Sequence, residues 1–163
     1  MQTHFIVWLF TCFAIISVYQ ACDPGWKSFQ DSCYQFFTEL KSWPDAKAHC
    51  ESIESHLVIV MTSDENNFLK SYLRQIRHTQ HIDQVWMDGD DFKSEGSWIW
   101  DNTGEKFEIL DWGPGEPNQN GGEEDCVSFY SHDNFRWNDE HCNKNFNFLC
   151  EYELYTNESS ILG

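Results

Sequence analysis

Gly115-Glu116-Pro117-Asn118 is followed along the chain by Gly121-Gly122-Glu123-Glu124-Asp125-Cys126 and then by Trp137-Asn138-Asp139. These stretches concentrate oxygen-bearing side chains, namely the carboxylates of Glu116, Glu124 and Asp139 and the amides of Asn118 and Asn138. Calcium in proteins takes about 6–8 oxygen ligands and mixes carboxylates, amides and backbone carbonyls, whereas magnesium demands a tighter octahedron and keeps its waters. The pattern therefore predicts a calcium site built from separate stretches of chain.

The charge of the chain is concentrated around these stretches. The 163 residues carry a formal net charge of −17, and from Asp83 to Glu140 there are 16 Asp or Glu against three Lys or Arg. Nucleic acid is not expected as a partner, because phosphate binding needs clustered Lys and Arg. An acidic stretch is either a solvated surface or a cation site, and the oxygen-rich spacing favours the cation site.

The N-terminus predicts export. Residues 5–18 are almost wholly apolar, and no Lys, Arg, Asp or Glu precedes Asp23. The run is shorter than the about 20 residues that span a bilayer, so residues 1–21 are interpreted as a secretory signal peptide that ends at Ala21. A membrane-anchoring helix is the alternative. No later segment is apolar enough for membrane insertion, so the chain is predicted to be secreted and extracellular.

Six cysteines follow the predicted cleavage point, and an even number in an oxidising compartment indicates three disulfides. They are Cys22, Cys33, Cys50, Cys126, Cys142 and Cys150. Spacing alone does not choose among the many pairings, and the absence of a C-x-x-C pair argues against zinc. Residues 22–152 are predicted to form one domain, and residues 153–163 a short tail in which Asn157 begins a glycosylation sequon.

Periodicity predicts two helices and several short strands. Residues 26–37 alternate aromatic and polar side chains as a hairpin does, and residues 42–53 have a helical pattern capped by Ser42. A second helix begins after Thr62, where Glu65 completes a capping box, and it carries the apolar stripe Phe68, Leu69, Tyr72, Leu73 and Ile76. Further strands are predicted at 57–61, 127–130, 136–137 and 147–152.

Residues 88–125 form a long, acidic stretch that is rich in Gly and has little periodicity. Such a segment inside a small domain is either functional or disordered, and its interleaved tryptophans argue against disorder. The side chains of Trp98, Trp100, Trp112 and Trp137 are predicted to lie in the core rather than to stack on sugar. His132 and His141 are predicted to be surface residues without a catalytic role.

Glu116-Pro117-Asn118, Glu124-Asp125-Cys126 and Trp137-Asn138-Asp139, set between Cys50 and Cys150, resemble the C-type lectin family over about residues 22–152. The resemblance implies an α+β double-loop domain with two helices and two small antiparallel sheets. It also implies three disulfides, namely Cys22–Cys33, Cys50–Cys150 and Cys126–Cys142. One departure is Trp86-Met87-Asp88-Gly89, where the family has Trp-Ile-Gly-Leu in a core strand.

The same resemblance implies a principal Ca²⁺ ligated by Glu116, Asn118, Glu124, Asn138 and Asp139, with a cis peptide bond before Pro117. Two vicinal equatorial hydroxyls of a sugar would complete the coordination and bond to Glu116, Asn118, Glu124 and Asn138. The Glu-Pro-Asn order resembles the mannose-type subgroup, which implies mannose, N-acetylglucosamine, glucose or fucose. Asp91, Glu95, Glu124 and Asp125 stand where the family binds an auxiliary Ca²⁺, although Gln119 replaces a carboxylate there.

Two other classes of function are alternatives to a lectin. An enzyme is not expected, because metal coordination accounts for the carboxylates and no reactive partner faces them. A C-type lectin-like protein that binds protein or mineral, and little sugar, is the alternative, since strong acidity suits contact with mineral. A site that holds two hydroxyls would bind a monosaccharide weakly, so avidity would require several domains, for example in a homo-oligomer.

Overall fold

The sheet of this protein is formed by two antiparallel ladders that meet along one parallel pair of strands. The computed structural model describes residues 21–154; the Asn157 sequon and all but the last residue of the predicted signal peptide lie outside the described residues. The strands are β1 (Lys27–Phe29), β2 (Ser32–Lys41), β3 (His56–Leu57), β4 (Gln84–Asp90), β5 (Ile99–Trp100), β6 (Cys126–Tyr130), β7 (Arg136–Glu140) and β8 (Phe146–Glu153).

The strand order is β1-β2-β8-β4-β6-β7, with β3 paired to β8 and β5 paired to β4. The resemblance implied two separate antiparallel sheets. The parallel pairing of β4 with β8, through Val85↔Asn147 and Trp86↔Phe148, instead joins them into one mixed sheet. The class of fold is as expected: an α+β C-type lectin-like domain with two helices in the described region and three disulfides.

Helix α1 (Trp43–Ser52) and helix α2 (Ser63–Ile76) begin where the sequence predicts. Ser42 Oγ accepts the Asp45 N–H, and Thr62 Oγ1 accepts the Glu65 N–H at 3.2 Å. The capping box at α2 is incomplete, because the Glu65 carboxylate accepts the Met61 N–H at 2.9 Å and the Tyr34 hydroxyl at 2.6 Å. Within residues 21–154, neither helix has the length and apolar character of a membrane span.

The core contains the predicted side chains. Leu69 and Leu73 of α2 are fully buried, and Trp100 and Trp137 pack edge to face at 5.9 Å. Trp98 is buried and Trp112 is half-buried against the same cluster, so the four tryptophans belong to the core as predicted. The three disulfides join Cys22 to Cys33, Cys50 to Cys150 and Cys126 to Cys142, which confirms the pairing.

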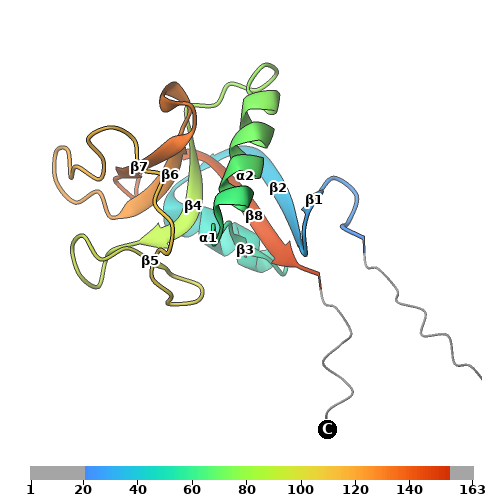
Figure 1. Cartoon of the computed structure of the whole chain (residues 1–163), viewed down its shortest axis with the longest axis horizontal. Helices are drawn as coiled ribbons and strands as arrows, with labels where there is room; N and C mark the ends of the chain where they lie inside the picture. The colour runs from blue at the N-terminus through green and yellow to red at the C-terminus, as the bar shows by residue number, and fades with distance from the viewer. Residues whose placement is uncertain (1–20, 155–163) are drawn as a thin grey trace, which may run out of the picture.

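Several predicted strands were wrong in extent: β7 continues past residue 137 to Glu140 and β2 past residue 37 to Lys41, whereas the strand at 57–61 is shorter than expected. Residues 57–61 were expected to be a strand, but β3 ends at Leu57. Val58 donates its N–H to Leu149 at 2.9 Å and accepts the Asp88 N–H at 3.0 Å, so the chain crosses between β8 and β4 and does not pair with either in regular register. Figure 1 shows the loops between β4 and β6 at the side of the domain away from the described end of β8.

Candidate functional site

Strand β7 places two of the predicted ligands. Its residues pair with β6 over five positions, including Ser128↔Asn138 and Val127↔Asp139. Because successive side chains of a strand point to opposite faces, Asn138 and Glu140 share one side of β7 while Asp139 points to the other. Asp139 is 1% exposed, and Asn138 and Glu140 are half-buried.

The loop that carries Glu116 and Asn118 is bonded directly to β7. Gly113 donates its N–H to the carbonyl of Trp137 at 2.8 Å, and the chain then turns through a cis Glu116–Pro117 bond, as the resemblance to the C-type lectin family implies. The Asp139 carboxylate accepts the backbone N–H of Asn118 at 2.8 and 3.0 Å. Asp139 therefore faces the Glu-Pro-Asn turn from the strand side.

Within this turn, polar side chains bond to one another. Asn118 Nδ2 donates to Glu116 Oε2, and the Glu116 carboxyl also lies within hydrogen-bonding reach of Asp139. Asn138 Nδ2 donates to the carbonyl of Asp139 at 2.5 Å. The structure thus brings together Glu116, Asn118 and Asp139, three of the five ligands predicted for the principal ion, whereas the Asn138 amide bonds the backbone of its neighbour and Gln84 Oε1.

The fifth predicted ligand, Glu124, is linked to this turn through Gln119 and Asn120. Glu124 is 6% exposed, and its Oε2 accepts the Asn120 N–H at 2.5 Å. Gln119 Oε1 accepts the Glu124 N–H at 2.9 Å, and Gln119 Nε2 donates to Glu95 Oε1 at 2.8 Å. The Gln119 side chain therefore connects Glu124 with the region of the predicted auxiliary site.

Three of the predicted auxiliary residues converge. Carboxylate oxygens of Asp91, Glu95 and Asp125 lie within 4.8 Å of one another. Asp91 is 2% exposed, and its Oδ2 accepts the Gly96 N–H at 2.7 Å. The other oxygen, Oδ1, is buried and has no hydrogen-bond partner. A buried carboxylate oxygen without a donor is costly unless a cation or a water compensates it.

Carboxyl groups in both the predicted principal site and the predicted auxiliary site have raised pKa values. Burial, followed by the hydrogen bond and negative charge of Asp139, raises the pKa of Glu116 to about 7. Burial and the charges of Glu95 and Asp125 raise the pKa of Asp91 to about 6. Burial is also the main cause of the raised pKa values of Glu124 and Asp125. These carboxylates repel one another, and a cation would relieve that repulsion.

The donor set fits calcium. The converging groups are carboxylate and amide oxygens with backbone carbonyls nearby, which hard divalent cations prefer, and Asp91 Oδ1 is a buried oxygen that is free to ligate a cation. Sequence reasoning missed one more group, because Glu124, Glu140 and His141 also place ligand atoms within 4.8 Å of one another. The period of two along β7 could have indicated that Glu140 lies beside Asn138. His141 is half-buried, and His132 is exposed as predicted.

Fold and site together define a C-type lectin domain, and comparison with known proteins agrees. The lectin C-type domain family matches residues 39–152, so the chain belongs to the C-type lectin family. This family binds carbohydrate and is not enzymatic, in agreement with the sequence-based expectation.

Individual relatives cover most of the chain. It is 33% identical to a lectin of Pleurodeles waltl over 80% of its own length and 76% of that protein's. The carbohydrate-recognition domain of the mouse scavenger receptor C-type lectin superposes with a TM-score of 0.73 at 33% identity, covering 83% of this chain and 100% of that domain. The cow CD23 domain, solved in the presence of a GlcNAc2Man3 oligosaccharide, has a TM-score of 0.72 at 28% identity and covers 82% of this chain and 98% of that one.

Proposed function

We propose that this protein binds carbohydrate in a calcium-dependent manner through Glu116, Asn118, Glu124, Asn138 and Asp139. The observation that carries the proposal is the convergence of Glu116 and Asn118 on Asp139, which comes from a distant stretch of chain. Ca²⁺ at this position would supply coordination to two vicinal sugar hydroxyls. With the ion bound, the carboxylates of Glu116 and Glu124 would accept hydrogen bonds from the sugar hydroxyls, and the amides of Asn118 and Asn138 would donate hydrogen bonds to the hydroxyl oxygens.

The proposed sugars are those of the mannose-type subgroup, with equatorial 3- and 4-hydroxyls. The order of Glu116 and Asn118 around Pro117 supports this class, since it determines which side of the ion accepts and which side donates. The likeness to a cow CD23 domain studied with an oligosaccharide of mannose and N-acetylglucosamine is compatible with it. Mannose, N-acetylglucosamine, glucose and fucose are the candidates.

Retention on mannose-agarose in calcium tests this proposal. The protein should bind in millimolar calcium and elute with EDTA, because the chelator removes the ion that the hydroxyls coordinate. The double variant Glu116→Gln with Asn118→Asp exchanges an acceptor and a donor, and it should shift preference towards galactose. Equal retention with and without EDTA would end the proposal.

Three subsidiary proposals accompany it. Asp91, Glu95 and Asp125, with Glu124, are proposed to hold an auxiliary Ca²⁺, supported by their convergence and by the orphaned oxygen of Asp91. Secretion is proposed on the three disulfides, which form and persist in oxidising compartments. Since one shallow site binds a monosaccharide weakly, a homo-oligomer is proposed as the source of avidity.

A protein-binding or mineral-matrix role with little sugar binding is the second candidate. The excess of acidic residues, with a net charge of −17, favours it because carboxylates at a surface can contact calcium in a mineral. Binding of the protein to calcium carbonate particles, measured with and without saturating mannose, separates the two. Strong adsorption to the mineral, together with no retention on mannose-agarose, would favour this candidate.

A further inference from the structure

An imidazole lies beside two carboxylates at the end of β7. Ligand atoms of Glu124, Glu140 and His141 lie within 4.8 Å of one another. Glu140 is the last residue of β7 and His141 follows it, whereas Glu124 stands on the loop before β6. Because the three residues come from two separate stretches of chain, no short zinc motif marks them in the sequence. Glu140 and His141 have no role in the proposed calcium sites.

Both carboxylates are held by hydrogen-bond donors from outside this group. Gln84 Nε2 donates to Glu140 Oε2 at 3.1 Å, and the Asn120 N–H donates to Glu124 Oε2 at 2.5 Å. Glu124 is 6% exposed, and its other oxygen, Oε1, accepts no hydrogen bond from residues 21–154. A buried carboxylate oxygen without a donor is costly unless a water or a cation compensates it. One oxygen of Glu124 is therefore available to a cation.

The imidazole of His141 is oriented as metal-binding histidines commonly are. Its Nδ1 lies 2.7 Å from the carbonyl oxygen of Glu123. Because a carbonyl oxygen only accepts, the neutral ring carries its proton on Nδ1 and keeps a lone pair on Nε2. Nε2 lies towards the loop that leads to Glu124, 3.8 Å from where a Cβ on Gly121 would stand. A metal-ligating histidine typically donates its other ring N–H to a carbonyl or a carboxylate in this way.

The donors of this group differ from those of the proposed calcium sites. Calcium takes oxygen ligands, whereas an imidazole nitrogen suits zinc and other first-row transition metals. Two carboxylates and one imidazole supply three protein ligands, the number with which a zinc ion keeps a fourth position for water or another ligand. Tetrahedral zinc ligands at about 2.0–2.1 Å from the ion lie about 3.3 Å apart. The atoms, now within 4.8 Å of one another, therefore need to approach by at most about 1.5 Å.

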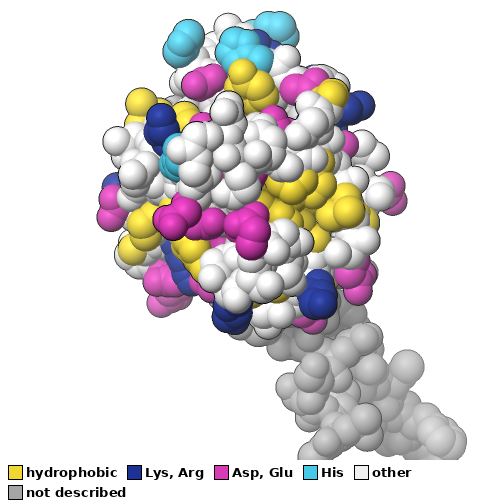
Figure 2. Space-filling view, turned by 90° about the vertical axis from the view of Figure 1, so that its left-hand side faces the viewer, with side chains coloured by type: hydrophobic (Ala, Val, Ile, Leu, Met, Phe, Trp, Pro, Cys, Tyr) yellow, Lys and Arg dark blue, Asp and Glu magenta, His cyan; other side chains and the backbone are white. Residues whose placement is uncertain are grey.

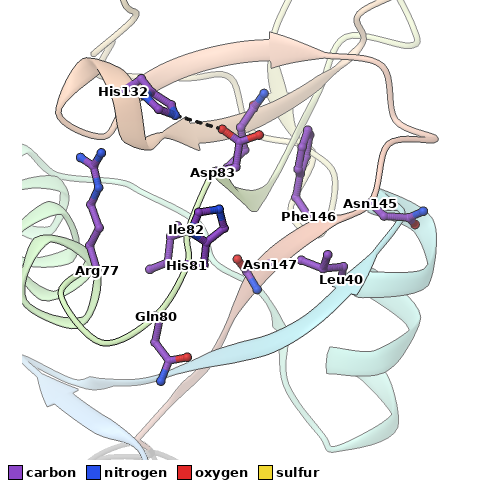
Figure 3. A pocket seen from close by; sticks show the side chains of 11 residues that line it. Leu40, Arg77, Gln80, His81, Ile82, Asp83, His132, Asn145, Phe146 and Asn147 are labelled. Carbon is purple, nitrogen blue, oxygen red and sulfur yellow. Dashed lines mark ion pairs between the residues drawn. The ribbon is translucent and has the colours of Figure 1, made fainter.

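Other histidines offer such an ion no comparable group. Figure 2 shows histidine side chains gathered at one end of the molecule. In Figure 3, His81 and His132 line a groove of about 540 Å³, and His132 Nε2 lies 3.5 Å from Asp83 Oδ1. Within residues 21–154, no set of three possible ligand atoms at this spacing includes either of these two histidines. Among the described histidines, His141 alone belongs to such a set.

We propose that Glu124, Glu140 and His141 bind Zn²⁺, and that this ion competes with the principal Ca²⁺ for Glu124. The competition rests on the proposed function, because it takes Glu124 as a calcium ligand, whereas the zinc site itself does not depend on it. Two divalent ions that shared one carboxylate would lie close together and repel each other. Zinc therefore weakens calcium binding and, through calcium, the binding of sugar.

The first test is a calorimetric titration of the calcium-free protein with Zn²⁺ alone. We expect one Zn²⁺ per chain, bound with micromolar affinity. His141→Gln and Glu140→Gln each remove one ligand and should weaken this binding by about tenfold or more. His141→Gln should leave calcium affinity in the absence of zinc unchanged, which also shows that the variant folds. His132→Gln, the matched control, removes an exposed histidine of the groove and should bind zinc as the native protein does.

The second test repeats the calcium titration in saturating zinc. The apparent calcium affinity of the native protein should fall by about tenfold, and that of His141→Gln should not. Absence of zinc binding, or equal zinc affinity in the native protein and His141→Gln, overturns the zinc site. An equal loss in His132→Gln assigns the ion to surface histidines and overturns it as well.

The remaining outcomes separate the two parts of the proposal from the proposed function. Zinc bound with unchanged calcium affinity, or an equal fall in His141→Gln, overturns the competition for Glu124. Failure of calcium and sugar to bind in the absence of zinc overturns the proposed function, and zinc binding that depends on His141 then still supports the zinc site.

Discussion

The two halves of the proposed calcium site are held in different ways. Asn138 and Asp139 stand on β7, which is fixed by its ladder with β6. Glu116, Asn118 and Glu124 stand on a loop with no regular partner strand. There the Asp139 carboxylate accepts the N–H groups of Asn118 and Gln119, at 2.8 and 2.9 Å. The sheet thus fixes the positions of Asn138 and Asp139, and the Asp139 carboxylate in turn holds the loop that carries the other proposed ligands.

The positions of the loop ligands therefore depend on the Asp139 carboxylate, whereas the position of Asp139 is set mainly by the pairing of β7 with β6. A second connection reaches the loop from α2. Asp111, at the start of the loop, pairs with Lys70 and accepts Asn66 Nδ2 at 2.7 Å, and Asn66 accepts the Trp137 indole N–H at 3.1 Å. Helix α2 therefore contacts both halves of the site.

The largest effect is expected for Asp139→Asn, which breaks the link between the halves. The amide keeps one acceptor but turns a donor towards backbone N–H groups, so both a ligand and the clamp on the loop are lost. Calcium affinity should fall by about 100-fold or more in a calorimetric titration. Glu123→Gln removes an exposed charge from the same region and should cost little. Similar losses in both variants would mean that only net charge matters.

The helix connection is tested by Lys70→Met. Lys70 is 8% exposed, and its loss leaves the Asp111 carboxylate partly buried without its cation. The free energy of unfolding should fall by about 2 kcal/mol in chemical denaturation, and calcium affinity should fall with it. Lys144→Met, an exposed control, should change neither. Lower stability with unchanged calcium affinity would show that α2 supports the core and not the loop.

Asp88, on β4, is a buried carboxyl group whose ionisation destabilises the folded state. Asp88 is fully buried, and burial raises its pKa to about 7, so the folded state favours the protonated acid. The contribution of Asp88 to the free energy of unfolding is fully present below about pH 4, where the folded and unfolded chains both bind the proton. It is lost as the pH rises through about 7, where Asp88 ionises in the folded state. Asp88→Asn should therefore raise the free energy of unfolding at pH 8 by about 1–2 kcal/mol, measured in EDTA, and by less at pH 5. The exposed control Asp31→Asn should show no such difference, and a gain independent of pH would contradict this account.

The smallest effect is expected for Gln119→Asp, which changes the proposed auxiliary site and leaves the ligands of the principal site in place. The new carboxylate would join Asp91, Glu95 and Asp125, at the loss of the Gln119–Glu95 hydrogen bond. A second calcium-binding event should strengthen by about tenfold or less. Asn120→Asp adds the same charge one residue away and should not reproduce the change. If it does, the effect is long-range electrostatics.

Much of the fold could be predicted from local sequence patterns. Ser42 and Thr62 cap the two helices, and the stripe through Leu69 and Leu73 packs into the core, because caps and helical periodicity depend on residues within a few positions. The extent of the strand at 57–61 could not be read in the same way. Its apolar residues fit a strand, but the chain there passes between β8 and β4, which no local pattern encodes.

The sequence by itself determined which oxygen-bearing side chains are available to the proposed site, in three stretches of chain, with a proline that places Glu116 and Asn118 on either side of one turn. Only the tertiary structure decided that the Asp139 carboxylate holds that turn, that Gln119 joins it to Glu95, and that Gln84 bonds to Asn138. These contacts join residues far apart in the chain. Their geometry depends on how the sheet and α2 bring the segments together, since side-chain type fixes what a group can bond and not what lies within its reach.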